Sequence, residues 1–341
     1  LAFADLERMD KKKLVGVIMA GGLWCLFKAF PFGDMPKPDQ TPAAVIVHLD
    51  SLEPFHPSSE VFLKDNMPLF DYGLQVLSRF TEKVIVSSLF SNPSDMGDLR
   101  LQVTHRVQGP YPAGDPGVLL YHIKKRPEEN HAWSISAQDL LLVASLLKNG
   151  KYPTQRVMTL GGGLAGKPRH LMTRLGVPLS RLAGGEVDSE KGVRYIAGGV
   201  FKGYAAQADA CMGLCETSLL VVPEGNTKEL FGFARPGFNK ASYSKTFLSR
   251  FRSAPFDVDC GLHGEKRACI NCGYCAAVCA VDILPQFTLK TVLAGEVEEA
   301  LAHGLLDCVS CGLCTFVCPS KIDICHILRK AKADYYHEIS S

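Results

Sequence analysis

The sequence has no long apolar run, no polybasic run and no large excess of charge of one sign. Of its 341 residues, 47% are hydrophobic and 21% are charged, and the formal net charge is +2. This apolar fraction excludes a mainly disordered chain, and without a polybasic run no nucleic-acid partner is expected. At about 150 residues per domain, the length predicts two or three domains. Because the first residue is Leu1 rather than methionine, we interpret the chain as a processed or truncated piece.

One segment imitates a targeting signal. Lys11–Lys13 precede the apolar stretch Leu14–Phe27. This stretch is shorter than the about 20 residues that a membrane-spanning helix requires, and no small-x-small cleavage site follows it. We interpret it as a buried, glycine-containing segment, with a signal anchor as the alternative. No other segment is long and apolar enough to span a bilayer, so the chain is not expected to be integral to a membrane.

The pattern of the first half predicts an α/β domain. Buried strands are expected at Ala43–Leu49 and Lys83–Ser88, with a helix between them. Short apolar strands separated by helices are typical of a parallel sheet. A further helix is expected at Ser136–Leu147, opened by Ser136 or Asp139, because both residue types favour the helix N-cap.

A small, mainly β module is expected next. Short strands at Arg156–Leu160, His170–Thr173 and Tyr195–Ala197 alternate with glycine-rich connections. A connecting segment that contains Leu219–Val222 then leads to the cysteine-rich last quarter. The expected division is an N-terminal segment and linker at 1–42, an α/β domain at 43–150, the β module at 151–207, the connecting segment at 208–255 and a cysteine-rich domain at 256–341.

Acidic residues and cysteines are both concentrated in the last quarter. Residues 256–341 carry 7 Lys+Arg against 11 Asp+Glu, a net charge of −4, so the remainder, with 30 against 24, carries +6. Ten of the 13 cysteines lie in the same quarter. A disulfide-rich secreted scaffold spreads its cysteines through a short chain, whereas these lie in two tight runs. The pattern therefore favours metal binding in a reduced compartment.

The two cysteine runs have the same spacing. Each reads Cys-x2-Cys-x2-Cys-x3-Cys, and a proline follows the second run. In bacterial ferredoxins with this spacing, three thiolates of a run bind one [4Fe–4S] cluster and the fourth cysteine binds the other. We therefore expect two clusters with crossed ligation. The ligands of the first are Cys269, Cys272, Cys275 and Cys318, and those of the second are Cys308, Cys311, Cys314 and Cys279.

Zinc is the main alternative to an iron–sulfur site. Zinc sites use paired C-x2-C knuckles with four ligands per ion, which two consecutive four-cysteine runs fit poorly. The gap Val281–Asp307 has room for an amphipathic helix, and Ser320–Asp323 resembles a capping box that opens a second helix, so we expect an α-helical ferredoxin domain. Of the other cysteines, Cys211 and Cys215 are interpreted as buried thiols, with a metal pair as the alternative, and Cys325 as a core residue.

Several separated segments carry a resemblance to a known family. They are His131–Asp139, Tyr152–Leu160, Glu229–Lys240, Leu313–Lys321 and the turn Gly109–Gly114. At these places the sequence resembles the A subunit of the Na+-translocating NADH:quinone reductase, which in that family has a further N-terminal domain. Typical members have lost both cysteine runs. In keeping them, the chain resembles the C subunit of the related Rnf ferredoxin:NAD+ oxidoreductase.

The resemblance implies a multidomain fold. Its parts would be a Rossmann-like α/β domain, a soluble-ligand-binding β-grasp domain at the β module and the C-terminal α-helical ferredoxin domain with two [4Fe–4S] clusters. It implies an electron-transfer subunit of a membrane-associated, sodium-translocating NADH:quinone oxidoreductase-type complex. The subunit would be peripheral on the cytoplasmic face of the bacterial inner membrane, with the other subunits as partners and quinone as a candidate ligand.

The same resemblance leads to an expected loss of FMN and NADH binding. The Rnf subunit binds them with a glycine-rich loop. Here only Gly21 and Gly22 remain adjacent, and the bulky Leu23, Trp24 and Phe27 stand where small residues let a phosphate approach backbone N–H groups. Two alternatives stay open: an Rnf-like NADH/ferredoxin oxidoreductase subunit with its own FMN site, and a structural subunit stapled by clusters. No catalytic residue stands out in the sequence.

Overall fold

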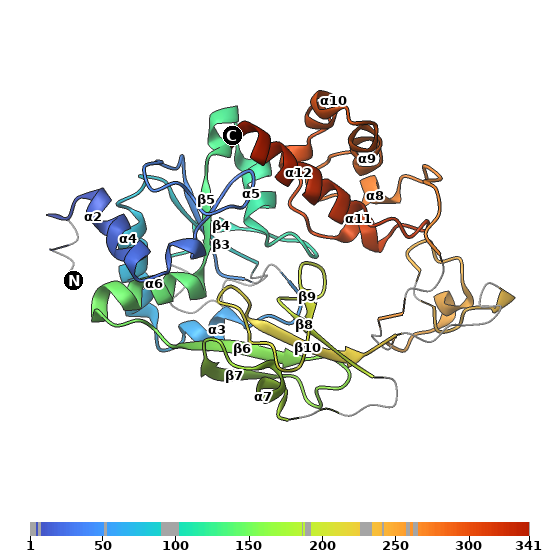
Figure 1. Cartoon of the computed structure of the whole chain (residues 1–341), viewed down its shortest axis with the longest axis horizontal. Coiled ribbons are helices and arrows are strands. Elements are labelled where there is room, and N and C mark those ends of the chain that lie inside the picture. The colour runs from blue at the N-terminus through green and yellow to red at the C-terminus, as the bar shows by residue number, and fades with distance from the viewer. Residues whose placement is uncertain are drawn as a thin grey trace. The chain divides into compact units, whose positions relative to one another are not determined.

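The computed structural model describes residues 5, 8–50, 53–89, 102–185, 187, 192–225, 234–240, 242–256, 260–261 and 265–340. The chain divides into two compact units, the first formed by Leu1–Val157 with Met172–Leu175 and the second by Met158–Leu171 with Gly176–Ser341. One five-stranded sheet belongs to the first unit, and a second five-stranded sheet lies mainly in the second unit (Figure 1). Part of Glu229–Lys240, which carries the family resemblance, lies outside the described residues.

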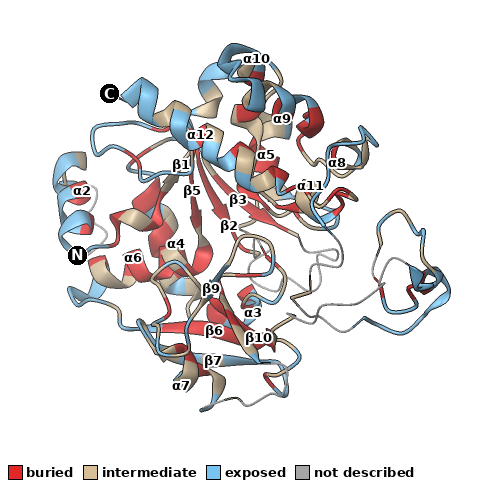
Figure 2. Cartoon of the chain, turned by 45° about the vertical axis from the view of Figure 1, so that its right-hand side comes forward, coloured by how far each residue is buried: buried red, intermediate tan, exposed pale blue. Residues whose placement is uncertain are grey.

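The first sheet has the strand order β1-β5-β2-β3-β4. β2 pairs in parallel with both β3 and β5, and β4 pairs in parallel with β3, whereas β1 is antiparallel to β5. This confirms the predicted parallel strands. Every residue of β2 is buried, as expected for a central strand of a parallel sheet (Figure 2). The strands are β1 Lys28–Ala29, β2 Val45–His48, β3 Val84–Ser88, β4 His105–Arg106 and β5 Trp133–Ser136.

Helices accompany this sheet, and α6 packs against α4 and α2 (Figure 1). The Ser136 Oγ accepts a hydrogen bond of 3.0 Å from the backbone N–H of Asp139, which confirms Ser136 as the predicted cap of α6. The helices are α2 Lys11–Ala20, α3 Ser59–Leu63, α4 Met67–Leu77, α5 Pro116–Ile123 and α6 Ala137–Asn149, with 3-10 turns η1 at Trp24–Leu26 and η3 at Pro127–Asn130.

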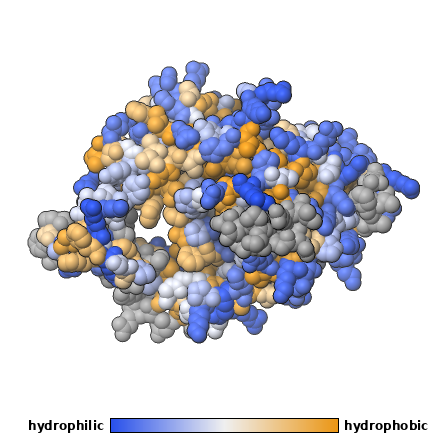
Figure 3. All heavy atoms as spheres, turned by 180° about the vertical axis from the view of Figure 1, so that it is seen from behind, coloured by the Kyte–Doolittle hydropathy of each residue, from blue (hydrophilic) through white to orange (hydrophobic). Residues whose placement is uncertain are grey.

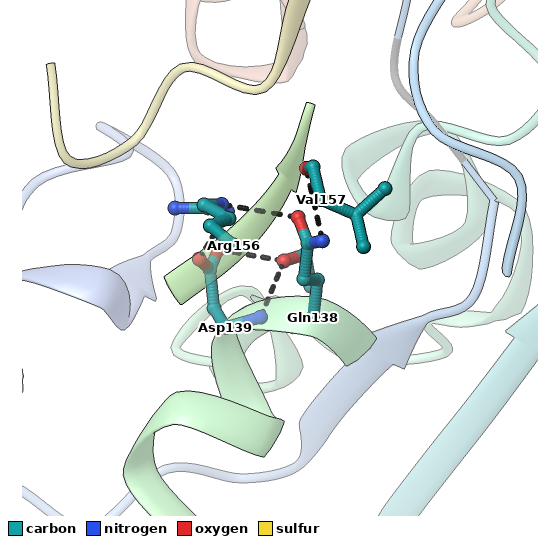
Figure 4. A network of polar contacts seen from close by, with 5 residues as sticks. Gln138, Asp139, Arg156 and Val157 are labelled. Carbon is teal, nitrogen blue, oxygen red and sulfur yellow. Dashed lines mark hydrogen bonds and ion pairs between the residues drawn. The ribbon is translucent and has the colours of Figure 1, made fainter. Parts of the chain in front are cut away.

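A buried ion pair ties the start of β6 (Gln155–Gly161) to α6 (Figure 4). The Arg156 guanidinium donates to the Asp139 carboxylate at 2.6 Å and, through Nε, to the Gln138 Oε1 at 3.0 Å. The Gln138 Nε2 donates in turn to the Val157 carbonyl at 3.0 Å. The Arg156 side chain is 1% exposed and that of Asp139 13%, so the two charges are paired out of water.

Both tryptophans lie in the core of the first unit. Trp24 and Trp133 pack edge to face with ring centroids 5.6 Å apart, and Phe27 and Phe80 pack against both. The Trp24 Nε1 donates to the Pro36 carbonyl at 2.8 Å, so the buried N–H of the indole has a hydrogen-bond acceptor. The prediction that the apolar N-terminal stretch is a buried segment holds in part. The stretch supplies two of these four rings, but Val17 and Met19 on α2 are exposed.

The second sheet has the order β7-β6-β10-β8-β9. The three strands predicted for the β module are present. The sequence predicts Leu219–Val222 in the connecting segment, but the structure places it in β10, which is parallel to β6 and antiparallel to β8. Its pairing partners are distant in sequence, so a four-residue apolar run alone does not reveal a strand. The remaining elements are β7 Arg169–Arg174, α7 Leu179–Ala183, β8 Val193–Ala197, β9 Tyr204–Ala206 and β10 Ser218–Pro223.

The cysteine-rich part is helical between its runs. One helix is expected between the runs, but the structure has two, α9 and α10, which are separated at Gly295–Glu296. The capping box predicted at Ser320–Asp323 is wrong, because the Ser320 Oγ donates to the Ala268 carbonyl at 2.9 Å instead of accepting a helix N–H. Asp323 accepts one, from His326 at 3.2 Å. The elements are the turn η5 Leu248–Phe251, the helices α8 Tyr274–Ala277, α9 Pro285–Ala294 and α10 Val297–Ala302, the turn η6 Leu305–Asp307, and the helices α11 Leu313–Phe316 and α12 Ile324–Ser340.

Within the described residues, no helix has the length and apolar character needed to cross a membrane. The apolar stretch Leu14–Phe27 is divided between the ten-residue helix α2 and the turn η1, so it does not form one long helix. On the face seen from behind in Figure 3, hydrophobic residues are interspersed with hydrophilic ones.

Candidate metal centre

The two cysteine runs fold into the same local structure, 39 positions apart. Helices α8 and α11 begin at Tyr274 and Leu313, and helices α9 and α12 begin at Pro285 and Ile324. The residues with left-handed backbone repeat at the same spacing, as the pairs Asn271 and Ser310, Gly273 and Gly312, and Asp282 and Lys321. Glycine adopts this conformation without strain, and each of the two glycines is the N-cap of the short helix that carries the third cysteine of its run.

One pocket brings cysteines of the second run together with cysteines of the first. Cys279, the last cysteine of the first run, lines it together with Cys308, Cys311 and Cys314. The four cysteines that the sequence assigns to the second cluster therefore line one pocket. The rest of the lining is mostly apolar, and it includes two further cysteines: Cys275, Val278, Ala280, Val281, Ile283, Pro285, Val309, Ser310, Leu313, Cys325 and Leu328.

The cysteines assigned to the first cluster lie partly at the surface and partly in a core. Cys269 and Cys272 are exposed. Cys275 and Cys318, which come from different runs, are buried in the same hydrophobic cluster, against helix residues such as Leu289. This site is therefore more open to solvent than the pocket of the second run.

Burial raises the pKa of several of these thiols. Desolvation raises the pKa of Cys279 and raises that of Cys311 to about 11, and the neighbouring Cys308 acts in the same direction on both. Desolvation also raises the pKa of Cys275 and of Cys314. Because the thiolate is the form that binds iron, loading of the site is coupled to the release of protons.

A buried lysine, which sequence reasoning missed, holds the start of the second run. Lys332 on α12 is 8% exposed, and its Nζ donates to the carbonyls of Leu306 at 2.8 Å and Cys308 at 2.9 Å. Lysine is rarely buried unless it is partnered. Its ammonium lies against the backbone of a run whose bound thiolates would be negative. Nothing in the helical pattern of α12 distinguishes this lysine from the exposed Lys330 two positions earlier.

The donor set of this pocket fits an iron–sulfur cluster. In the described part of the chain, no three His, Cys, Asp or Glu side chains converge on a point where one ion could bind. In a [4Fe–4S] cubane each thiolate binds a different iron, so the ligands surround the group instead of meeting at one point. An all-cysteine lining with apolar walls therefore fits an iron–sulfur cluster.

The cysteines outside the runs differ from their predicted environment. Cys211 and Cys215 are exposed, so their interpretation as buried thiols is wrong. They lie in the connection between β9 and β10, and the local sequence pattern does not show whether a connection of this kind is covered by another element. Cys325, interpreted as a core residue, is half-buried and lines the pocket of the second run.

The glycine pair of the N-terminal segment ends a helix instead of opening one. The backbone N–H of Gly21 donates to the Val17 carbonyl at 3.0 Å, and that of Gly22 to the Met19 carbonyl at 2.8 Å. Phosphate groups bind at helix N-termini, where backbone N–H groups are unpaired. Here both N–H groups are used by the last turn of α2, and the bulky Trp24 that follows is 2% exposed in the core.

Comparison with known families first defines the class of protein. Residues 268–322 match the model of a 4Fe-4S dicluster domain, so this is an iron–sulfur protein with mixed α/β sheets and a C-terminal ferredoxin-type domain. Residues 9–152 match the model described as the NqrA second alpha/beta domain, and residues 157–208 match that of the NQRA C-terminal domain.

Relatives along nearly the whole chain then identify the family. The chain is 33% identical over 331 residues to the A subunit of Na(+)-translocating NADH-quinone reductase from Neisseria gonorrhoeae, covering 95% of this chain and 74% of the relative. It is 31% identical over 335 residues to the corresponding protein of Rhodopirellula baltica, covering 97% and 74%. The chain therefore belongs to the NqrA family, the A subunits of Na+-translocating NADH-quinone reductases, and is a component of an oxidoreductase complex.

A solved structure of an NAD+-reducing [NiFe]-hydrogenase in the H2-reduced state has a TM-score of 0.48 at 13% identity, over 98% of this chain and 63% of that one. This likeness is too low to carry an argument about fold or function.

Proposed function

We propose that this chain is an electron-transfer subunit of a membrane-associated, Na+-translocating NADH:quinone reductase-type complex, and that its two cysteine runs bind two [4Fe–4S] clusters. The names of its relatives support the complex and its other subunits as partners. The dicluster match supports iron–sulfur binding, which supplies one-electron transfer. The observation that carries the proposal is the pocket in which Cys279 of the first run lies among three cysteines of the second.

Crossed ligation is part of the proposal. Cys279 lines the pocket of the second run, and Cys318 is buried in one cluster with Cys275 of the first run. Because the two runs have the same local structure, we expect the fourth cysteine of each run to bind the cluster of the other run. We assign to the first cluster Cys269, Cys272, Cys275 and Cys318, and to the second Cys308, Cys311, Cys314 and Cys279.

The first unit is proposed as a Rossmann-like scaffold that has lost FMN and NADH binding. Its parallel sheet supports the scaffold, and the hydrogen-bonded N–H groups of Gly21 and Gly22 support the loss. The second sheet is proposed as a β-grasp domain that comprises residues 151–207 and, in addition, β10. The two retained cysteine runs are proposed as a feature shared with the Rnf C subunit. Quinone is a candidate ligand, and the cytoplasmic face of the membrane is the proposed location.

The test is anaerobic reconstitution of the full chain, followed by iron, sulfide and flavin assays and by EPR of the dithionite-reduced protein. We expect about eight irons per chain and two reducible clusters, with no flavin. A wild-type chain that binds only about four irons would contradict the two-cluster proposal, and clusters that dithionite does not reduce would favour a purely structural role.

Two matched variants test the crossed ligation. Cys318→Ala is expected to remove the EPR signal of the first cluster and to keep that of the second, because its sulfur is assigned to the first. Cys279→Ala is expected to do the reverse. Loss of the second cluster alone in Cys318→Ala would overturn the assignment.

A further inference from the structure

The repeat of the two runs pairs Cys325 with Gln286. Gln286 is the second residue of α9 and Cys325 the second residue of α12, 39 positions later. Gln286 is 8% exposed, and its Oε1 lies 3.3 Å from the Cys275 Sγ. Because the two ends of an amide are assigned from such contacts, an N–H of Gln286 can equally face this sulfur when it is a thiolate. The first run thus has an amide against the sulfur of its third cysteine.

In the second run a thiol stands at the equivalent position. Cys325 lines the same pocket as Cys308, Cys311 and Cys314. Its backbone N–H donates to the Thr315 Oγ1 at 2.8 Å, which holds the start of α12 beside the residue that follows Cys314. Six cysteines line this pocket. Cys275 is assigned to the first cluster, so five sulfurs, Cys279 among them, remain where four would bind the second.

We propose that Cys325 is a reserve ligand of the second cluster, whose sulfur binds the iron assigned to Cys314 when that cysteine no longer does. The exchange replaces one iron–sulfur bond by another and releases the thiol proton of Cys325 to solvent, with no electron transferred. The first cluster has no such reserve, because Gln286 stands in its place. This inference rests on the proposed cluster assignment.

The experiment measures iron per chain, together with EPR, after anaerobic reconstitution of the full chain with iron and sulfide. Alanine is used, because a serine hydroxyl can itself bind iron. The wild type and Cys325→Ala are expected to hold about eight irons, and Cys314→Ala also about eight, with an altered EPR signal of the second cluster. The double variant Cys314→Ala/Cys325→Ala is expected to hold about four. A fall of Cys314→Ala alone to about four irons would overturn the proposal.

The repeat supplies a matched control in the first run. Cys275→Ala is expected to fall to about four irons, because an amide stands where the second run has a thiol. Adding Gln286→Cys to Cys275→Ala transplants the fifth sulfur and is expected to restore about eight. Conversely, Cys314→Ala/Cys325→Gln gives the second run the residue of the first and is expected to hold about four. Equal iron contents with and without the transplanted cysteine would count against a ligand role.

The outcomes separate this inference from the proposed function. A wild type with about four irons or none contradicts the two clusters and the reserve ligand together, whereas eight irons in the wild type and four in Cys314→Ala contradict the reserve ligand alone. Should Cys314→Ala lose its fold by circular dichroism, the transplant in the first run decides. A Cys275→Ala/Gln286→Cys variant that holds no more iron than Cys275→Ala would then overturn the proposal.

Discussion

At the scale of single residues, the Arg156–Asp139 pair shows how burial decides the worth of an ion pair. The two side chains are 1% and 13% exposed and 2.6 Å apart, and Gln138 satisfies a further donor of the guanidinium. The pair Lys83–Glu129 is 4.0 Å apart and far more exposed. Removing one partner of a buried pair leaves the other charge unpaired in a poorly solvated site, whereas an exposed partner is rehydrated.

Arg156→Met is therefore expected to lower the free energy of unfolding of the first unit by about 3–5 kcal/mol, and Lys83→Met by less than about 1 kcal/mol. Urea unfolding followed by tryptophan fluorescence measures this unit, since both tryptophans of the chain lie in its core. Equal effects of the two variants would show that burial does not control the strength of this pair.

At the scale of elements, the close packing of α4 on α6 depends on Gly73, which has no side chain. A β-carbon on Gly73 of α4 would lie 2.7 Å from the Cγ of Leu140, which is fully buried on α6. A larger residue at position 73 therefore requires the Leu140 side chain or one of the two helices to shift. A β-carbon on Gly16 of α2 would meet no atom within 4 Å.

Gly73→Ala is expected to destabilise the first unit by about 1–3 kcal/mol, because overpacking outweighs the better helix propensity of alanine. Gly16→Ala, the matched change in another helix, is expected to stabilise it by roughly 0.5–1 kcal/mol through propensity alone. Thermal or urea unfolding of both variants measures the difference. A stabilising effect of Gly73→Ala would mean that α4 and α6 can move apart without loss of packing.

At the scale of the whole molecule, we expect the cysteine-rich part to depend on its proposed clusters for folding. Its helices α8 and α11 have four residues each, and its hydrophobic cluster includes the proposed ligands Cys275 and Cys318. Such short helices are not stable in isolation. The first unit, in contrast, has a core of buried strands and aromatic rings that contains no proposed ligand.

Anaerobic chelation of iron from the reconstituted chain is therefore expected to remove hydrogen-exchange protection from residues 268–322, while protection in β2, β3 and β5 persists. Mass spectrometry of peptides from the loaded and chelated protein measures both parts in one experiment, with the first sheet as the internal control. Unchanged protection of the cysteine-rich part after complete iron removal would contradict a folding role of the clusters.

The sequence by itself determined the features that depend on local spacing. Short apolar runs separated by helical patterns identified the parallel strands β2 and β3, and Ser136 identified the start of α6, because these signals act within a few residues. The cysteine spacing identified the ferredoxin-type domain for the same reason: steps of three residues determine how one loop can present its thiolates.

Only the tertiary structure decided the features that join distant parts of the chain. The place of β10 between β6 and β8, the pairing of Arg156 with Asp139, the burial of Lys332 and the position of Cys325 in the pocket of the second run all depend on partners outside the local pattern. Spacing along the chain carries no information about which distant segment covers a residue. Because burial and pairing determine what a charge or a thiol can do, these properties appear only when the chain is folded.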